Sequence, residues 1–481
     1  MEKDIIYDMK KYKICLMAVG LSFLLGSCQI TPNPGDIKED THLSLFAIND
    51  FHGSYSYDEG AKQTGLSRIG EYLINEKKSD PNTIVLASGD IFQGGAESNL
   101  TRGEVVIDAM NEIGFDAMSV GNHEFDWGEE TLKEMANKMD FPLLNTNIFY
   151  KGTENQPEYF DSSVVINKGN LRVGIVGSVA EGIGSSILSS VSKDFDYLNP
   201  TFYAAREARR LRVEEKCDVV ILSTHDGSIV PYKDLAKTDS MTNKRFIDAL
   251  FLGHSHQKME GYLDSENKVS YLQGGNNGKY ISNIELDIKV TNNKYEVKVA
   301  SSKNISTFEI CKSESSVINE NYLKYKDHIE EVMNEVLTTL PSYASKTSLL
   351  NYALKSMYDY FNAHLEIFKE EINMSFMNSG GIRSSAQPGV FTYGDLIKVI
   401  PFDNTLCVAK VTQSQYRSAK FNAHYEGKTP DFENSEFVYI GGIDYVATKD
   451  TFQKEELYMY NDQLLRDVVA ENIRLNGYEY L

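Results

Sequence analysis

The feature that most constrains this 481-residue sequence is an alternation of short apolar runs with amphipathic segments, beginning near residue 43. The runs LSLFAI (43–48) and TIVLAS (83–88) have the composition of buried strands. Between them, Leu66, Ile69 and Leu73 recur at helical spacing. Strands that alternate with helices build layered α/β domains, because each helix buries its apolar face against a sheet. We therefore predict such a domain over residues 41–305.

A different pattern follows the α/β domain. Residues 318–340 predict a polar amphipathic helix that Pro341 terminates. We interpret residues 306–345 as a helical connector between two domains. Residues 346–481 are predicted to form a smaller α+β domain that opens with a helix and a strand (348–365 and 372–378).

The N-terminus has the features of an export signal. Three lysines precede the apolar run ICLMAVGLSFLL and the small residues before Cys28. The run is too short for a comfortable membrane span. The stretch LGSC resembles a bacterial lipobox, which implies a signal peptide over 1–27, a lipid on Cys28 and a tether over 28–40. A plain signal peptide or a poor membrane helix is the alternative.

Acidic residues near the start fit a signal poorly, so we hypothesise that translation begins at Met9. With the lipobox, the signal predicts an extracytoplasmic protein anchored to the membrane through Cys28. Beyond the tether, three widely spaced cysteines without a CxxC pair imply no disulfide framework (Cys217, Cys311 and Cys407).

The net charge of −21 bears on partners. It argues against a nucleic-acid polymer, since binding one needs a basic surface. An anionic small substrate would need a local positive site, and bound metal ions would provide one.

Polar residues follow five of the apolar runs directly. In layered α/β folds the strand ends gather at one edge of the sheet, so these residues could meet in space. Asp, Asn and His are ligands suited to divalent first-row metals. Taken singly, any one of these histidines could be an ordinary loop or core residue. The residues are Asp50, His52, Asp90, Asn122, His123, Asp126, His225, His254 and His256.

Two of these segments contain i, i+2 pairs, Asp50 with His52 and His254 with His256. In extended backbone such pairs project to the same side, so each pair could share a metal. Two adjacent divalent ions can activate water and clamp a phosphoryl group.

These motifs resemble the metallophosphoesterase signature of the bacterial 5′-nucleotidase family, which includes UDP-sugar hydrolases and 2′,3′-cyclic-nucleotide phosphodiesterases. The resemblance rests on NDFHG, GDIFQGG, GNHEFDWG, STHDG and GHSH. It continues in NSGGIRSSAQPGVFTYGDLIKVIPFDN, which is similar to that family's C-terminal domain, and covers most of 41–445. The implied fold is a four-layer αββα sandwich with a second, smaller α+β substrate-binding domain.

The resemblance also implies roles for the strand-end residues. One metal would be held by Asp50, His52, Asp90 and His256, the last standing where relatives often carry Gln. The other would be held by Asp90, Asn122, His225 and His254, so that Asp90 bridges. His123 would stabilise charge on the phosphoryl group and Asp126 would orient it, whereas Glu124 would be structural and Trp127 would pack at the base of the site.

For substrate binding, the resemblance points to Arg383, Asn404 and Phe437, with Phe437 stacking on the base. Relatives usually carry a late Gly-Gly-Asp-Gly-aromatic segment that supplies a second stacking ring, and this sequence departs from that pattern. Either the clamp is one-sided, or the chain continues naturally beyond Leu481, or another ring substitutes (Tyr458, Tyr460 or Tyr478).

We therefore expect a monomeric two-metal phosphohydrolase that acts on nucleoside 5′-monophosphates, with Mn, Zn, Co or Mg as the ions. Two alternatives within the enzyme class are a 2′,3′-cyclic-nucleotide phosphodiesterase and a nucleotide-sugar diphosphatase. A lipoprotein that binds nucleotides without turnover and a surface scaffold are alternatives of other classes.

Overall fold

The computed structural model describes residues 39–187, 189–264, 266, 268–291, 294–418, 423–448, 452 and 456–478. The signal peptide, most of the tether and the lipidation site Cys28 lie outside these residues. Within them, no helix is both long and apolar enough to cross a bilayer.

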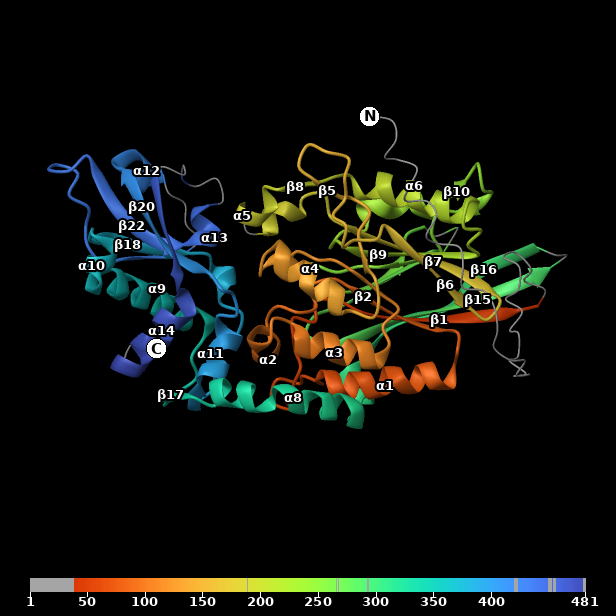
Figure 1. The fold of residues 1–481 in the computed structure, drawn as a ribbon, viewed down its shortest axis with the longest axis horizontal. Coiled ribbons are helices and arrows are strands. Elements are labelled where there is room, and N and C mark those ends of the chain that lie inside the picture. Colours follow the sequence, from red (N-terminus) through yellow and green to blue (C-terminus); the bar gives the residue numbers. More distant parts are fainter. Residues whose placement is uncertain are drawn as a thin grey trace, which may run out of the picture. The chain divides into compact units, whose positions relative to one another are not determined.

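Two six-stranded sheets form the first domain (Figure 1). Within each sheet, the strands that precede the polar motifs run parallel to one another. The first sheet has the order β16 (Lys294–Ser306), β15 (Tyr280–Thr291), β1 (Thr41–Ile48), β2 (Thr83–Ser88), β3 (Ala117–Ser119), β4 (Leu143–Leu144). The second has the order β13 (Lys258–Tyr262), β14 (Ser270–Gly274), β12 (Ala249–Phe251), β9 (Val219–His225), β7 (Leu171–Val179), β6 (Ser163–Lys168).

Alternating side chains sort these strands into four layers. In β1, Leu45 packs between the two sheets, whereas Phe46 packs against helices on the other side. The apolar cluster on the helical side of the first sheet includes residues of α1 (Leu66–Ser79), α3 (Glu104–Ile113) and α8 (Ser316–Met333), and α6 (Pro200–Val213) covers the second sheet. Because side chains alternate along a strand, each sheet buries one face on its partner sheet and one on helices. The predicted αββα sandwich is confirmed.

The C-terminal part contains a mixed five-stranded sheet. Helices α9 (Lys346–Ala363), α11 (Tyr393–Val399) and α14 (Leu465–Asn476) contribute to the apolar cluster on one face. A separate cluster that includes Phe376 and Val411 covers the other face. The strand order is β21 (Ala423–Glu426), β18 (Ile372–Met377), β22 (Phe437–Ile443), β20 (Thr405–Thr412), β23 (Leu457–Leu464).

The predicted helix over 318–340 is wrong at its C-terminal end. Helix α8 ends at Met333, and β17 (Val336–Leu340) pairs with β19 (Gly389–Thr392). The β-branched residues in VLTTL favour a strand, and Pro341 can follow a strand as well as end a helix. Helix α8 also packs on the first domain, where Tyr322 stacks on Tyr55 at a ring distance of 5.3 Å.

Candidate metal centre and active site

The structure brings the predicted metal ligands together at the strand ends. Five of them have positive φ angles between 47° and 72°, although none is glycine (Asp50, His52, Asp90, His254 and His256). Such backbone is uncommon outside glycine and concentrates at functional sites. The extended backbone expected for the two i, i+2 pairs is therefore wrong, because the backbone there is left-handed.

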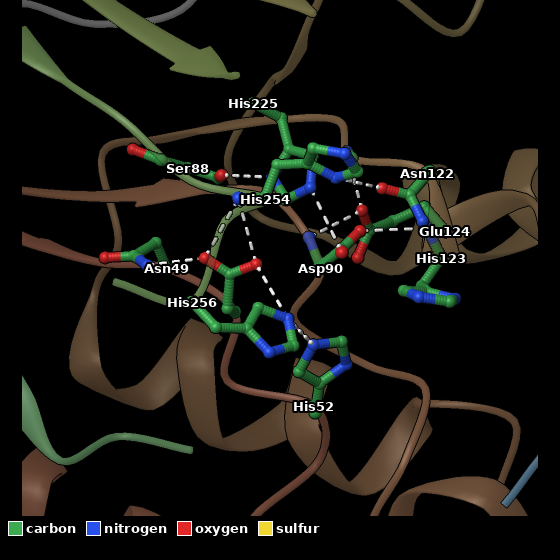
Figure 2. Close-up of polar contacts among 12 residues, drawn as sticks. Asn49, His52, Ser88, Asp90, Asn122, His123, Glu124, His225, His254 and His256 are labelled. Carbon is green, nitrogen blue, oxygen red and sulfur yellow. Dashed lines mark hydrogen bonds and ion pairs between the residues drawn. The ribbon is translucent and has the colours of Figure 1, made fainter. Parts of the chain in front are cut away.

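The first group of candidate ligands consists of Asp50, His52, Asp90 and His256. One ligand atom from each lies within 4.8 Å of all the others. The Nδ1 atom of His52 donates to the Gln93 carbonyl at 3.0 Å, which turns its Nε2 atom toward the group. There it lies 3.0 Å from Nε2 of His256 (Figure 2). Two imidazoles and two carboxylates thus face a common point.

The second group shares Asp90 with the first and adds His225 and His254. The Nδ1 atom of His225 donates to the Ser88 carbonyl at 2.8 Å. Its Nε2 atom is buried and makes no hydrogen bond, although it lies 3.1 Å from Oδ2 of Asp90. Asn122 places its Oδ1 atom 2.9 Å from Nδ1 of His254, so a neutral oxygen completes this group.

These residues fit a divalent metal. Burial raises the pKa of Asp50 to about 7. The nearby Asp90 carboxylate also raises this pKa, whereas His225 lowers it. A buried carboxylate whose charged form is disfavoured by burial is stabilised by a cation. The carbonyl partners of His52 and His225 fix the Nδ1–H tautomer, which leaves Nε2 as a lone-pair donor.

His123 stands beside the metal groups. Its backbone nitrogen donates to Oδ1 of Asp90 at 2.9 Å, and its Nδ1 atom lies 2.7 Å from Oδ2 of Asp126. Burial lowers the pKa of His123, but the carboxylates of Asp126 and Asp90 outweigh it and raise the pKa to about 9. This arrangement favours the imidazolium form of His123, whose Nε2–H can donate a hydrogen bond to a ligand.

A cavity of about 310 Å³ opens on His123 and the second group. Trp127 packs against the core, as expected, and it also lines this cavity. The C-terminal domain contributes the other wall, and Arg383 and Asn404 both lie in it. The remaining wall residues from this domain include Asn378, Gly380, Phe402, Asp403, Asp444 and Tyr445.

Phe437, which the resemblance assigns to stacking on a base, does not line this cavity. Phe437 begins β22, whereas the cavity residue Asp444 follows the other end of that strand. Seven strand residues span about 20 Å. Phe437 instead packs under Lys410, whose Nζ atom lies 4.3 Å from the ring centre.

The aromatic residues of the cavity's C-terminal wall are Phe402 and Tyr445, which the sequence reasoning missed. The Phe402 ring centre lies 5.5 Å from that of His123. Phe402 stands two residues before Asn404 in the motif PFDN, and this position could have identified it as a cavity residue. The three tyrosines considered as substitutes do not appear among the described residues of the cavity wall (Tyr458, Tyr460 and Tyr478).

Known proteins resemble this chain in both of its domains. Residues 43–258 match the calcineurin-like phosphoesterase family, and residues 328–451 match the 5′-nucleotidase C-terminal domain. An apyrase from Tabanus yao is 29% identical over 82% of this chain and 76% of its own length. A 5′-nucleotidase from Vibrio vulnificus is 24% identical over 83% of this chain and 79% of its own.

Solved structures show the same fold. A 5′-nucleotidase precursor from Thermus thermophilus aligns over 90% of this chain and 96% of its own, with a TM-score of 0.73 at 18% identity. The two matched domains occur in the order expected of one two-domain architecture. The chain therefore belongs to the 5′-nucleotidase family of calcineurin-like phosphoesterases and is a metal-dependent phosphoester hydrolase.

Proposed function

We propose that this chain hydrolyses nucleoside 5′-monophosphates and related phosphoesters outside the cytoplasm, with two divalent cations. One observation carries the proposal: two ligand groups share Asp90 and lie beside the His123–Asp126 pair. Such an arrangement suits phosphoryl transfer, which depends on positioning and on charge stabilisation.

In this proposal the first cation is held by Asp50, His52, Asp90 and His256, and the second by Asp90, Asn122, His225 and His254. When bound, divalent cations there supply Lewis-acid stabilisation of a phosphoryl group and of its attacking water. Mn, Zn, Co and Mg are the candidates, since mixed nitrogen and oxygen donors accept all four to different degrees.

The chain's own residues bind and orient the phosphoryl group. His123 donates a hydrogen bond from Nε2 to a phosphoryl oxygen, and Asp126 keeps the proton on Nδ1. Arg383 places a guanidinium in the same cavity, where its planar donors suit phosphate. The nucleoside contacts the C-terminal wall, with Phe402 and Tyr445 offering stacking surfaces worth roughly 1–3 kcal/mol per base.

The test is phosphate release after chelation and readdition of each metal. AMP, 2′,3′-cyclic AMP and UDP-glucose are compared, so the cyclic phosphodiesterase and nucleotide-sugar diphosphatase alternatives are separate outcomes. Replacing Asp90 with Asn, or His123 with Asn, should lower turnover by about 10²-fold or more. His42→Asn is a matched control, because it removes another His–Asp pair, 3.0 Å long, on a half-exposed side chain.

Binding of AMP without release of phosphate under any metal would instead identify a nucleotide-binding lipoprotein. A protein indifferent to both active-site substitutions in every assay would be a scaffold.

We also propose that the chain is exported and anchored through a lipid on Cys28, on the strength of the N-terminal sequence alone. Incorporation of a labelled fatty acid that Cys28→Ser abolishes would support the anchor. Release of the unlabelled wild-type protein into the medium would argue for a plain signal peptide.

A further inference from the structure

The loop that carries Phe402 and Asn404 is held by side chains from distant parts of the chain. The Pro401 carbonyl accepts hydrogen bonds from Nε2 of Gln93 at 3.0 Å and Nδ2 of Asn99 at 2.7 Å. It also accepts one from Nη1 of Arg466 at 3.2 Å. Three donors on one carbonyl define the position of the residue just before Phe402.

Asp403, on the other side of Phe402, lies between two guanidinium groups. Its Oδ2 atom is 2.6 Å from Nη1 of Arg102, and its Oδ1 atom is 2.7 Å from Nη2 of Arg466. Arg102 precedes α3, and Arg466 lies in α14. One carboxylate therefore joins the catalytic domain, the cavity loop and the last helix of the chain.

The same contacts reach the metal groups and the cavity wall. Gln93 binds Pro401 through its side chain, while its carbonyl accepts from Nδ1 of His52. Arg102 lies over the ring of Trp127, with its Cζ atom 5.7 Å from the ring centre. A displacement of Asp403 would thus move the adjacent Phe402, whereas Gln93 and Asn99 would still hold Pro401.

We propose that Asp403 is a positioning residue for substrate binding, and that Arg102 is the partner that holds it against the catalytic domain. The proposal rests on the proposed function, since it concerns how the nucleoside part of a substrate is held. Phe402 lies directly between the two anchored residues, so the Arg102–Asp403 pair fixes its ring near His123. The pair acts on binding of the nucleoside and not on the phosphoryl group.

Arg102 is the better residue to change. Its side chain is 56% exposed, whereas that of Arg466 is 9% exposed. Loss of Arg466 would remove the buried donor that bonds the Ile400 and Pro401 carbonyls and the Asp403 carboxylate, and would endanger folding. Loss of Arg102 removes a partly exposed ion pair, which contributes little to stability.

The experiment compares AMP with p-nitrophenyl phosphate, which has no nucleoside. Arg102→Met should raise the KM for AMP about fivefold and leave both kinetic constants for p-nitrophenyl phosphate within twofold. Arg102→Lys should restore most of the affinity. Arg474→Met is the matched control, because Arg474 lies on α14 in an exposed ion pair with Glu335.

A double-mutant cycle isolates the pair. In an Asp403→Asn background, Arg102→Met should change the KM for AMP no further. Equal effects of Arg102→Met on both substrates, or no effect on AMP, would overturn the proposal.

Binding of adenosine, measured by calorimetry, separates failure of this proposal from failure of the proposed function. A wild type that binds adenosine but releases no phosphate would refute only the proposed hydrolysis, and Arg102→Met should still weaken adenosine about fivefold. Undiminished adenosine affinity in Arg102→Met would overturn the inference, as would a wild type that neither hydrolyses AMP nor binds adenosine.

Discussion

The buried carboxylate of Glu124 accepts a hydrogen bond from the backbone nitrogen of Asp90 at 2.9 Å. The same carboxylate accepts from the backbone nitrogens of Ile91 at 2.8 Å and Gly121 at 2.6 Å. It therefore joins the loop after β2 to the loop after β3. Both loops carry candidate metal ligands, so Glu124 sets their separation through backbone nitrogens and is a member of neither ligand group.

Glu124→Gln should weaken metal binding about 10- to 100-fold, because it disturbs a residue that orients ligands. The amide can accept only at its oxygen, so at least one buried N–H loses its partner, at about 1–3 kcal/mol of stability. Metal titration by calorimetry and urea unfolding measure the two effects. Glu134→Gln, at an exposed position on α4 (Glu129–Lys138), serves as the control, and equal metal affinity in both variants would contradict this role.

Gly121 is required for a different reason. A Cβ atom there would lie 2.3 Å from Oδ1 of Asp90 and 2.6 Å from its backbone nitrogen, closer than any real contact. Gly121→Ala should therefore displace Asp90, which both metal groups share, and abolish metal-dependent turnover. Gly182→Ala is the control, since nothing lies within 4 Å of its Cβ position. Full metal-dependent activity in Gly121→Ala would show that the Asp90 loop tolerates displacement.

The sequence predicted the catalytic domain well because its signals are local. Each buried strand ends directly before its polar motif, as in β2 before Asp90, and parallel strands bring such ends together. What local patterns could not supply was backbone conformation: the extended pairs expected at His254 and His256 are left-handed. That conformation depends on contacts with distant loops, such as the bonds from His254 N to the Asp50 carboxylate.

The substrate wall was harder to predict for a related reason. Phe402 lies in the motif PFDN and Phe437 in the motif SEFVYIGGI. Both motifs are plausible sources of a stacking ring, and only the pairing of β22 with β20 shows which one faces the cavity. Phe437 is opposite Thr412 at one end, while Ile443 is opposite Leu406 at the other, near Asn404. Strand register sets which end of a strand lies at a site, and no local pattern here specified it.

The buried ion pair between Arg212 and Asp248 predicts a pH-dependent contribution to stability. The two side chains are 2% and 3% exposed and 2.6 Å apart. Burial raises the pKa of Asp248, but Arg212 and Arg245 outweigh it and hold the pKa below its usual value. A carboxyl group with a lowered pKa stabilises the fold above its unfolded pKa of about 3.9, and this stabilisation disappears as pH falls through the folded value.

Asp248→Asn should therefore lower the free energy of unfolding by about 3 kcal/mol at pH 7, because Arg212 is left buried without its charge partner. The difference from wild type should persist at pH 5 and shrink below about pH 4. Urea unfolding at these pH values measures it. Asp234→Asn, which breaks an exposed pair with Lys237, should change stability by less than about 0.5 kcal/mol. A difference that grows on acidification would reverse the assigned sign.

Phe402 and Phe437 provide a direct test of which ring contacts the nucleoside. Phe402→Ala should raise the KM for AMP by about 5- to 100-fold, corresponding to the roughly 1–3 kcal/mol of a base stacked on an aromatic ring. It should leave p-nitrophenyl phosphate hydrolysis nearly unchanged, because the proposed function assigns the phosphoryl group to His123, Arg383 and the metals. Phe437→Ala removes a ring of the same size at the far end of β22 and should not change either KM. If instead Phe437→Ala weakened AMP and Phe402→Ala did not, the cavity beside His123 would not be where the base binds.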